Sequence, residues 1–270
     1  MTAPFVLLGV PSFRGTPERE FIVALSETQN ALAAAGVGYS MTMLAGDPYL
    51  AKVRNRIAAK FLTDFPHATH LFFIDDDVGW APSKVPQLVM RGEDVVCGVY
   101  PKKLDQLEFP ATLELDDAGQ LIERDGLYQA HLAPTGFMCI ARHVLERMAM
   151  NSPRYMETSA TGEQLTQWSI FEARYVDNAM EALRGTDLDA LSHEDAIAHL
   201  KRSLGLVTPS EMGQWWGEDF WFTERWRQMG GKIWVDPEIA FTHRGSKAWS
   251  ATFGDSVRAV RAKMQEATHG

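Results

Sequence analysis

Cysteine is scarce in this 270-residue sequence, and long apolar runs are missing. The two cysteines, Cys97 and Cys139, stand alone within apolar segments, which excludes both a disulfide framework and a zinc site of paired cysteines. No stretch approaches the roughly 18 consecutive apolar residues of a membrane helix, and the N-terminal MTAPFVLLGV lacks the basic leader of a secretory signal. We therefore expect a cytoplasmic protein without a membrane span.

Basic residues are outnumbered by acidic ones. The chain has 26 Lys and Arg against 35 Asp and Glu, which gives a net charge of −9. A surface that was acidic throughout would repel nucleic-acid phosphates. The charge is uneven, however, because residues 151–211 carry ten acidic and five basic side chains, whereas residues 243–270 carry five basic and two acidic ones. Part of the surface can therefore still bind an anion.

Several common site motifs are also absent. Gly230-Gly231-Lys232 lacks the glycine spacing of a Walker loop, and the sequence contains neither G-x-G-x-x-G nor a serine elbow. His193 and His199 are six positions apart, whereas the helical metalloprotease pattern places its histidines at i and i+4. These absences exclude the phosphate-loop, dinucleotide-binding and zinc-protease classes that such motifs mark.

Apolar strands alternate with amphipathic helices in the first hundred residues. The pattern predicts helices over 18–35, over 49–65 and after Pro82, and strands over 5–10, 37–44, 71–74 and 94–99. Such alternation predicts an α/β fold with a mainly parallel central sheet, helices on both faces and ligands at the carboxyl ends of the strands. Beyond Pro101, shorter strand candidates predict a mixed or antiparallel extension, over 111–115, 121–124 and 136–140.

The composition, with 46% hydrophobic and 23% charged residues, is typical of compact globular proteins, and we expect a single catalytic domain over residues 1–270. Residues 151–214 are polar and acidic, with helical periodicity around 187–204, and predict a helical insertion or lid. A helix after Gly217 and a strand over 232–235 should follow. Residues 246–270 predict a basic helical C-terminal tail.

Three adjacent carboxylates, Asp75, Asp76 and Asp77, follow the predicted buried strand 71–74. Like charges this close repel unless a cation or hydrogen-bond donors compensate them, so a metal ion is one explanation. Side chains alternate sides in an extended segment, so Asp75 and Asp77 can face one ligand. The alternative is an acidic turn that caps the next helix.

The segment LFFIDDDV, residues 71–78, resembles the hydrophobic strand and DxD signature of glycosyltransferases with the GT-A fold, in particular family 2-like compact bacterial and phage enzymes. Four further segments resemble this family in the same order along the chain: 95–103, 134–140, 217–220 and 242–244. The resemblance spans roughly residues 5–245, with the polar insertion as its main departure. It implies a Rossmann-like GT-A domain that binds a nucleotide-sugar.

By this resemblance, Mn²⁺ or Mg²⁺ bridges the diphosphate of a UDP- or GDP-sugar donor, with Asp75, Asp77 and His243 as the candidate metal ligands. Carboxylate oxygens suit both ions, a histidine nitrogen favours Mn²⁺, and the ion would neutralise charge on the departing nucleoside diphosphate. The candidate donor-binding residues are Ser12, Arg14, Arg54, Asn55, Asp75, Asp76 and Lys102. Arg54 and Asn55 could equally form a solvated helix face, and of Lys102 and Lys103 we expect one to be simply exposed.

Glu218 and Asp219 match the acidic pair of the family and stand at a predicted helix start. In an inverting enzyme one of them, for which we favour Asp219, would be the base that deprotonates the acceptor. In a retaining enzyme they would orient the acceptor, and a purely structural capping role is the further alternative. Candidate acceptor-binding residues are Thr135, Gly136, Trp215 and Trp216, the two tryptophans being equally suited to a core.

These features predict a metal-dependent hexosyl- or pentosyltransferase that uses an acceptor hydroxyl. Glycan, lipid-linked sugar, protein and small-molecule acceptors stay open. A hydroxymethylated base in phage DNA also stays open, because the basic tail and the tryptophan pair could hold DNA and an extruded base. The competing interpretations are a nucleotidyltransferase and a non-catalytic sugar- or nucleotide-binding module.

Overall fold

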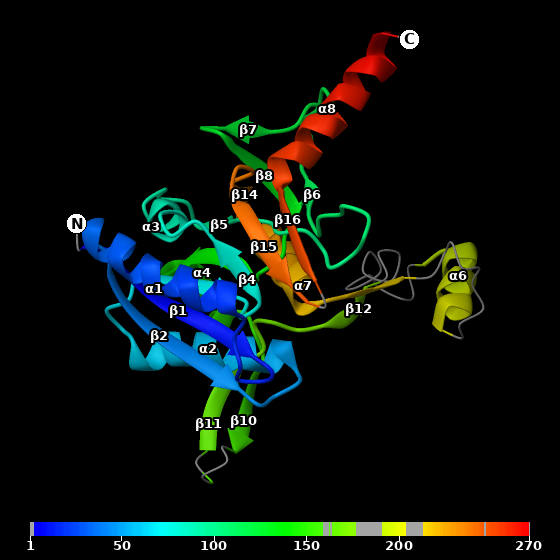
Figure 1. Ribbon diagram of the computed structural model, residues 1–270. Helices are drawn as coiled ribbons and strands as arrows, with labels where there is room; N and C mark the ends of the chain where they lie inside the picture. The colour runs from blue at the N-terminus through cyan, green and yellow to red at the C-terminus, as the bar shows by residue number, and fades with distance from the viewer. Residues whose placement is uncertain are drawn as a thin grey trace.

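The computed structural model describes residues 3–158, 162, 164–176, 191–203, 213–245 and 247–269. Their largest element is a nine-stranded sheet, with helices on both of its faces (Figure 1). In order across the sheet, the strands are β2 (Gly38–Ala45), β1 (Phe5–Ser12), β3 (His70–Ile74), β9 (Phe137–Ala141), β5 (Val95–Cys97), β14 (Ile233–Val235), β8 (Leu127–Leu132) and β6 (Thr112–Leu113), with β7 (Glu123–Arg124) beside β8.

The sheet is mixed rather than mainly parallel in its pairing. Strand β1 runs parallel to β2 and β3, and β5 runs parallel to β14, as the alternation of strands and helices predicts. Strand β9, however, lies between β3 and β5 and is antiparallel to both. The segment 136–140, expected in an extension of the sheet, thus supplies a central strand, and its amino end meets the carboxyl end of β3.

Helices cover both faces of the sheet, as expected for an α/β fold. Apolar residues of α1 (Arg19–Ala34) and α3 (Lys84–Val89) pack on one face. Those of α2 (Leu50–Asp64), α4 (Arg142–Met150) and α7 (Glu218–Gln228) pack on the other. The alternation of side chains along β1 explains this division, because Leu8 joins the first cluster and Leu7 joins the second.

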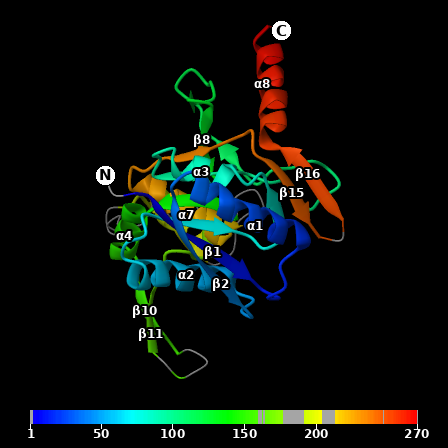
Figure 2. The ribbon, with the colours of Figure 1, turned by 60° about the vertical axis from the view of Figure 1, so that its left-hand side comes forward.

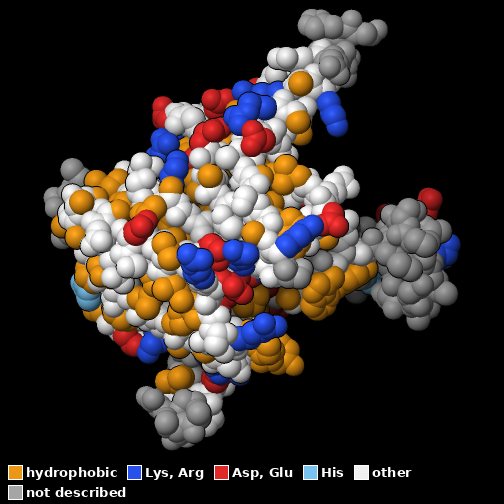
Figure 3. Space-filling model, viewed as in Figure 1, with side chains coloured by type: hydrophobic (Ala, Val, Ile, Leu, Met, Phe, Trp, Pro, Cys, Tyr) orange, Lys and Arg blue, Asp and Glu red, His pale blue; other side chains and the backbone are white. Residues whose placement is uncertain are grey.

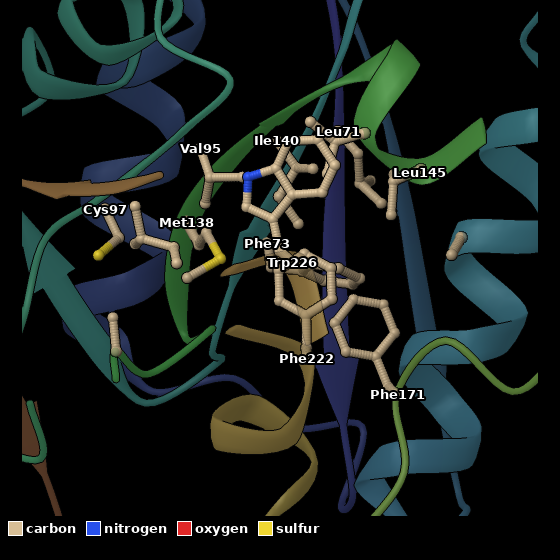
Figure 4. Close-up of a cluster of buried hydrophobic side chains, with 14 of the residues drawn as sticks. Leu71, Phe73, Val95, Cys97, Met138, Ile140, Leu145, Phe171, Phe222 and Trp226 are labelled. Carbon is tan, nitrogen blue, oxygen red and sulfur yellow. The ribbon is translucent and has the colours of Figure 1, made fainter. Parts of the chain in front are cut away.

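Aromatic side chains pack α7 against the central sheet near the carboxyl end of β3. Phe171 lies edge-on to Phe73 of β3, with ring centroids 5.3 Å apart, and stacks on Phe222 of α7 at 4.8 Å (Figure 4). Trp226, one turn further along α7, is also buried in this cluster. This packing holds the first turn of α7, with its two acidic residues, against the carboxyl end of β3.

A small second sheet returns the end of the chain to the acidic triplet. Strands β4 (Val78–Trp80), β15 (Ala240–Arg244) and β16 (Ala248–Thr252) form it in the order β16-β15-β4. The antiparallel register of β4 and β15 places His243 opposite Val78, the residue that follows Asp77. Two segments that are distant in sequence therefore meet at one point.

The described part of segment 151–214, expected to be helical, contains strands as well as a helix. Strands β10 (Arg154–Thr158) and β11 (Gln164–Trp168) form one hairpin, and β12 (Arg174–Val176) pairs with β13 (Gln214–Trp216). Helix α6 (His193–Ser203) falls within the periodic stretch 187–204, of which residues 187–190 and 204 lie outside the described residues.

The C-terminal segment contains helix α8 (Phe253–His269), which projects from the body of the molecule at the end opposite the β10–β11 hairpin (Figures 1 and 2). The segment 246–270, expected as a helical tail, thus contains strand β16 before this helix. Among the described residues, no helix is both long and apolar enough to cross a membrane.

Candidate active site

Polar side chains from several elements meet at one edge of the central sheet. Strands β1, β3 and β5 point their carboxyl ends to this edge, where Ser12, the acidic triplet 75–77 and the segment 98–103 stand. Strand β9 runs the opposite way, so Gly136 at its start lies at the same edge, and its carbonyl accepts a hydrogen bond of 2.8 Å from the Asp75 N–H. The edge is the place where ligands bind in open α/β sheets.

Arg54 of α2 joins the acidic triplet to the acidic pair of α7. Its Nη2 donates to Asp75 Oδ1 at 2.9 Å, and its Nη1 donates to Glu218 Oε1. Burial disfavours the charged guanidinium, but the carboxylates of Asp75, Glu218 and Asp219 outweigh that effect and raise the pKa of Arg54. Arg54 is therefore a buried cation that fixes two carboxylates from different elements.

Tyr100 holds the second oxygen of Asp75, a role that the sequence did not reveal. The Tyr100 hydroxyl donates to Asp75 Oδ2 at 2.5 Å, and burial, followed by the Asp75 charge, raises the pKa of Tyr100 well above its usual value. Gly136 makes the approach possible, because a Cβ at this position would overlap both the Tyr100 hydroxyl and the Asp75 carboxylate. In the sequence, the only signal for this role of Tyr100 was its position directly after the predicted strand 94–99.

Asp76 and Ser12 shape the loop between β1 and α1. The buried Ser12 hydroxyl donates to Asp76 Oδ2 and accepts a 3.0 Å hydrogen bond from the Gly15 N–H, while the Glu18 N–H donates to the Asp76 carbonyl at 2.9 Å. Burial raises the pKa of Asp76, and the neighbouring carboxylates add to this rise although the Ser12 hydrogen bond opposes it. Ser12, expected to bind the donor, thus acts on the loop through Asp76.

Asp77 and His243 face each other on the other side of the triplet. His243 Nδ1 lies 2.7 Å from the Pro101 carbonyl oxygen, to which it must donate, and Nε2 lies 3.5 Å from Asp77 Oδ1. Lys103 contacts the other oxygen of Asp77. Burial would raise the pKa of Asp77, but hydrogen bonds from His243 and Lys103 outweigh burial and lower it.

The chemistry of Asp77 and His243 suits a divalent cation. Because Nδ1 donates to the Pro101 carbonyl, Nε2 is the nitrogen that would face a cation shared with Asp77, and the Pro101 carbonyl is the outer partner that orients such a ligand. The third expected ligand, Asp75, is bound by Arg54 and Tyr100 instead. No set of three or more His, Cys, Asp or Glu side chains that could hold a metal occurs in the described part of the chain.

A cavity of about 530 Å³ opens beside Asp76 and Asp77. Its walls come from the β1–α1 loop, the acidic triplet and the ends of two later segments, and they comprise Phe13, Arg14, Thr16, Glu18, Asp76, Asp77, Lys103, Arg244 and Gly245. Basic and acidic side chains also lie side by side near the middle of the face shown in Figure 3. Three basic side chains next to three carboxylates, Glu18, Asp76 and Asp77, suit an anionic ligand together with a cation.

Lys103, rather than the expected Lys102, lies at this cavity. Lys103 lines the cavity and contacts Asp77, whereas Lys102 is not part of the lining and pairs with Glu108 on the surface. The neighbouring Lys102 and Lys103 take opposite directions, as successive residues do in extended backbone. Arg14 also lines the cavity.

Among the acidic residues of the site, Asp219 has the pKa that differs most from its ordinary value. It follows Glu218 in the first turn of α7, and burial, with the Glu218 charge as the second cause, raises its pKa to about 6. Within the described residues, its one hydrogen-bond donor is the Phe220 N–H at 2.8 Å. Since Arg54 is bonded to Glu218, Asp219 is the carboxylate of the pair that is available to accept a proton.

Asn55 belongs to the scaffold rather than to the cavity. Its Oδ1 accepts hydrogen bonds from the N–H groups of Ile170 and Phe171, at 3.0 and 2.8 Å, and its Nδ2 donates to the Phe171 carbonyl at 2.9 Å. Asn55 is buried, so its expected contact with the donor is replaced by a contact with this loop. On a helix, neighbours such as Arg54 and Asn55 point about 100° apart, which separates their roles.

The candidate acceptor residues lie in different environments. Thr135 is fully buried, and its hydroxyl has no hydrogen-bond partner among the residues that the structure describes, while Gly136 supports Asp75 as described above. Trp215 is 71% exposed, whereas Trp216, the next residue of β13, is partly buried. Of these four residues, Trp215 is the one that offers a large surface to a ligand.

Comparison with known proteins finds remote similarity among solved structures. No protein-family model and no curated protein matches the sequence. Among solved structures, one similar chain is a glycosyltransferase involved in the glycosylation of the major capsid of PBCV-1. The two chains share 11% identity over 78% of this chain and 79% of the other, with a TM-score of 0.30. The site residues themselves must therefore carry the functional interpretation.

Proposed function

We propose that the protein is a metal-dependent glycosyltransferase that transfers a sugar from a nucleotide-sugar to an acceptor hydroxyl. The observation that carries the proposal is the pairing of Asp77 with His243 at a cavity whose lining includes Arg14, Lys103 and Arg244. A carboxylate, an oriented imidazole and several cations together match the needs of a diphosphate and its metal ion.

The donor half of the site would bind the nucleoside diphosphate in this cavity. Asp77 and His243 would hold Mn²⁺ or Mg²⁺, with water and diphosphate oxygens as the remaining ligands. When bound, the ion supplies Lewis-acid stabilisation of the charge on the departing diphosphate. Arg14, Lys103 and Arg244 add positive charge around the phosphates, and Asp75, fixed by Arg54 and Tyr100, is the candidate for the donor ribose.

The acceptor half of the site would use Asp219 as general base. Its pKa of about 6 leaves Asp219 ionised at neutral pH yet basic enough to take a proton from a hydroxyl during attack. The acceptor oxygen forms the new bond to the anomeric carbon, the bond from that carbon to the diphosphate oxygen breaks, and the diphosphate leaves with the electron pair. The acceptor proton passes to Asp219, so a single displacement inverts the anomeric centre.

Product analysis with a panel of UDP- and GDP-sugars and Mn²⁺ tests the proposal. We expect release of nucleoside diphosphate and a metal-dependent rise in Tm with UDP or GDP, because a ligand that binds the native state stabilises it. Both should be lost in Asp77→Asn and in His243→Gln, while Lys60→Ala, which removes an exposed lysine of α2, should behave as the parent protein.

Two results would contradict the proposal. Release of pyrophosphate from a nucleoside triphosphate would indicate nucleotidyl transfer. Metal-dependent nucleotide binding that persists in Asp77→Asn and His243→Gln would show that these two residues do not hold the ion.

A further inference from the structure

The exposed aromatic surface of the β12–β13 ribbon is formed by Tyr175 and Trp215. The antiparallel register places these two residues directly opposite each other, so their side chains share one face of the ribbon. Trp215 is 71% exposed and Tyr175 is 51% exposed. Trp216 points to the other face, because successive residues of a strand alternate sides, and therefore Trp215 and Trp216 cannot enclose a ligand between them.

Gly213 fixes the ring of Tyr175 against the ribbon. The Gly213 N–H donates to the Tyr175 hydroxyl at 2.8 Å, and a Cβ at Gly213 would overlap both the Val176 carbonyl oxygen and the Tyr175 ring, whose Cζ would be 2.6 Å away. Gly213 directly precedes β13, so the tyrosine ring extends from β12 across to the residue before the partner strand. We call Tyr175, Gly213 and Trp215 the aromatic ribbon.

The aromatic ribbon leads directly into the candidate catalytic helix. Only Trp216 and Gly217 separate Trp215 from Glu218 and Asp219, the first residues of α7. The ribbon therefore lies at the start of the helix that carries the carboxylate proposed as general base. Large exposed aromatic surfaces of this kind mark binding sites on soluble proteins.

We infer that the aromatic ribbon binds the sugar rings of a neutral oligosaccharide acceptor, an inference that rests on the proposed glycosyl transfer. The C–H face of a pyranose ring packs on an aromatic face, and two aromatic side chains side by side offer an open surface for successive rings. An extruded nucleobase requires a closed pocket, which this open surface does not provide. Nucleic-acid phosphates would also be repelled by the carboxylates of Glu218 and Asp219 at the start of α7.

Titration with neutral hexasaccharides of glucose, mannose, galactose and N-acetylglucosamine, followed by calorimetry and saturation-transfer NMR, tests the inference. We expect at least one hexasaccharide to bind the parent protein and its affinity to fall about tenfold or more in Trp215→Ala and in Tyr175→Ala. Gly213→Ala should have a similar effect, because it displaces the tyrosine ring. Tyr49→Ala, which removes an aromatic side chain of 70% exposure before α2, should bind like the parent protein.

Trp215→Phe guards against misfolding, since it retains an aromatic face and should keep most of the affinity that Trp215→Ala loses. The inference is overturned if none of the hexasaccharides binds, or if Trp215→Ala binds as well as the parent protein. It is also overturned if a single-stranded oligodeoxynucleotide binds in a Trp215-dependent manner and the saccharides do not.

Failure of this inference is distinguishable from failure of the proposed function. Metal-dependent binding of UDP or GDP should be unchanged in every variant of the aromatic ribbon, because none of its residues lines the donor cavity. Intact nucleotide binding without saccharide binding contradicts the acceptor alone, whereas loss of nucleotide binding in the parent protein contradicts glycosyl transfer.

Discussion

Arg54 donates a 2.9 Å hydrogen bond to Asp75 while its other terminal nitrogen contacts Glu218. Asp75 follows the central strand β3, and Glu218 begins α7, so one buried guanidinium connects the proposed donor and acceptor halves of the candidate site. Two carboxylates near each other destabilise a fold unless a cation lies between them. The position of α7 therefore depends on the charge of a residue in α2.

Substitution of Arg54 should reduce stability. Arg54→Met leaves Asp75 and Glu218 without their cation, and we expect the free energy of unfolding to fall by about 3 kcal/mol. Urea denaturation measures the change. The double variant Arg54→Met/Glu218→Gln should recover part of the loss because one of the two carboxylates becomes neutral, and equal stability of the single variant and the parent protein would contradict the bridging role.

Asp219 should control the pH dependence of transfer. Since its pKa is about 6, the rate should rise as pH increases through that value and Asp219 loses its proton. Asp219→Asn should lower the rate by about 10²–10⁴-fold and leave metal-dependent nucleotide binding intact. Asp64→Asn, at a half-exposed position of α2, is the matched control, and a normal rate in Asp219→Asn would exclude the base assignment.

The same residue should also affect stability. The pKa of Asp219 is about 6, above the ordinary value of 3.8 for an aspartate, so between these two values the folded chain binds more protons than the unfolded chain. The contribution of Asp219 to the free energy of unfolding therefore decreases as pH rises through about 4 to 6. In Asp219→Asn this part of the decrease should disappear. Thermal unfolding of both proteins at a series of pH values gives the comparison, and identical pH profiles would disagree with a buried carboxylate.

Lys103 and Lys102 should differ in their effect on nucleotide binding. Lys103→Ala removes a positive charge from the cavity, and we expect the Kd for UDP or GDP with Mn²⁺ to increase about tenfold. Lys102→Ala removes a charge that pairs with Glu108 outside the cavity and should leave the Kd unchanged. If Lys102→Ala increased the Kd more than Lys103→Ala, Lys102 would be the donor-binding lysine, as expected from the sequence.

Gly136 should accept no side chain. Gly136→Ala places a methyl group where the Tyr100 hydroxyl meets the Asp75 carboxylate, so we expect loss of transfer together with a stability decrease of about 1–3 kcal/mol. Tyr100→Phe in the Gly136→Ala background removes the hydroxyl that overlaps the methyl group and should recover some stability. Crystallographic occupancy of the original Asp75 rotamer in Gly136→Ala would contradict this account.

The position of the candidate site could be predicted from the sequence better than the directions of its side chains. Strands, helices and the acidic triplet follow from local patterns, and the edge where ligands would bind follows from the alternation of strands and helices. The central place of β9 could not be foreseen, because it depends on pairing with β3 and β5 across long stretches of chain. Local propensity carries no information on such pairing.

Neighbouring residues account for most of the remaining differences. The sequence marks three pairs of neighbouring polar or aromatic residues, Arg54-Asn55, Lys102-Lys103 and Trp215-Trp216. Within each pair, the direction of the backbone decides where each side chain points. Tyr100 was missed because its function requires a glycine on a different strand. Such dependence on a distant residue becomes visible only when both strands are in place.

The loop after β1 and the end of β15 are tied to the acidic triplet by main-chain contacts. The Glu18 amide bonds to the Asp76 carbonyl at 2.9 Å, and the Arg244 amide bonds to the Asp77 carbonyl at 2.8 Å. A nucleotide held in the cavity would consequently damp the opening motions of the first and last parts of the described core together. Deuterium uptake at these two amides should slow in concert, although they are far apart along the chain.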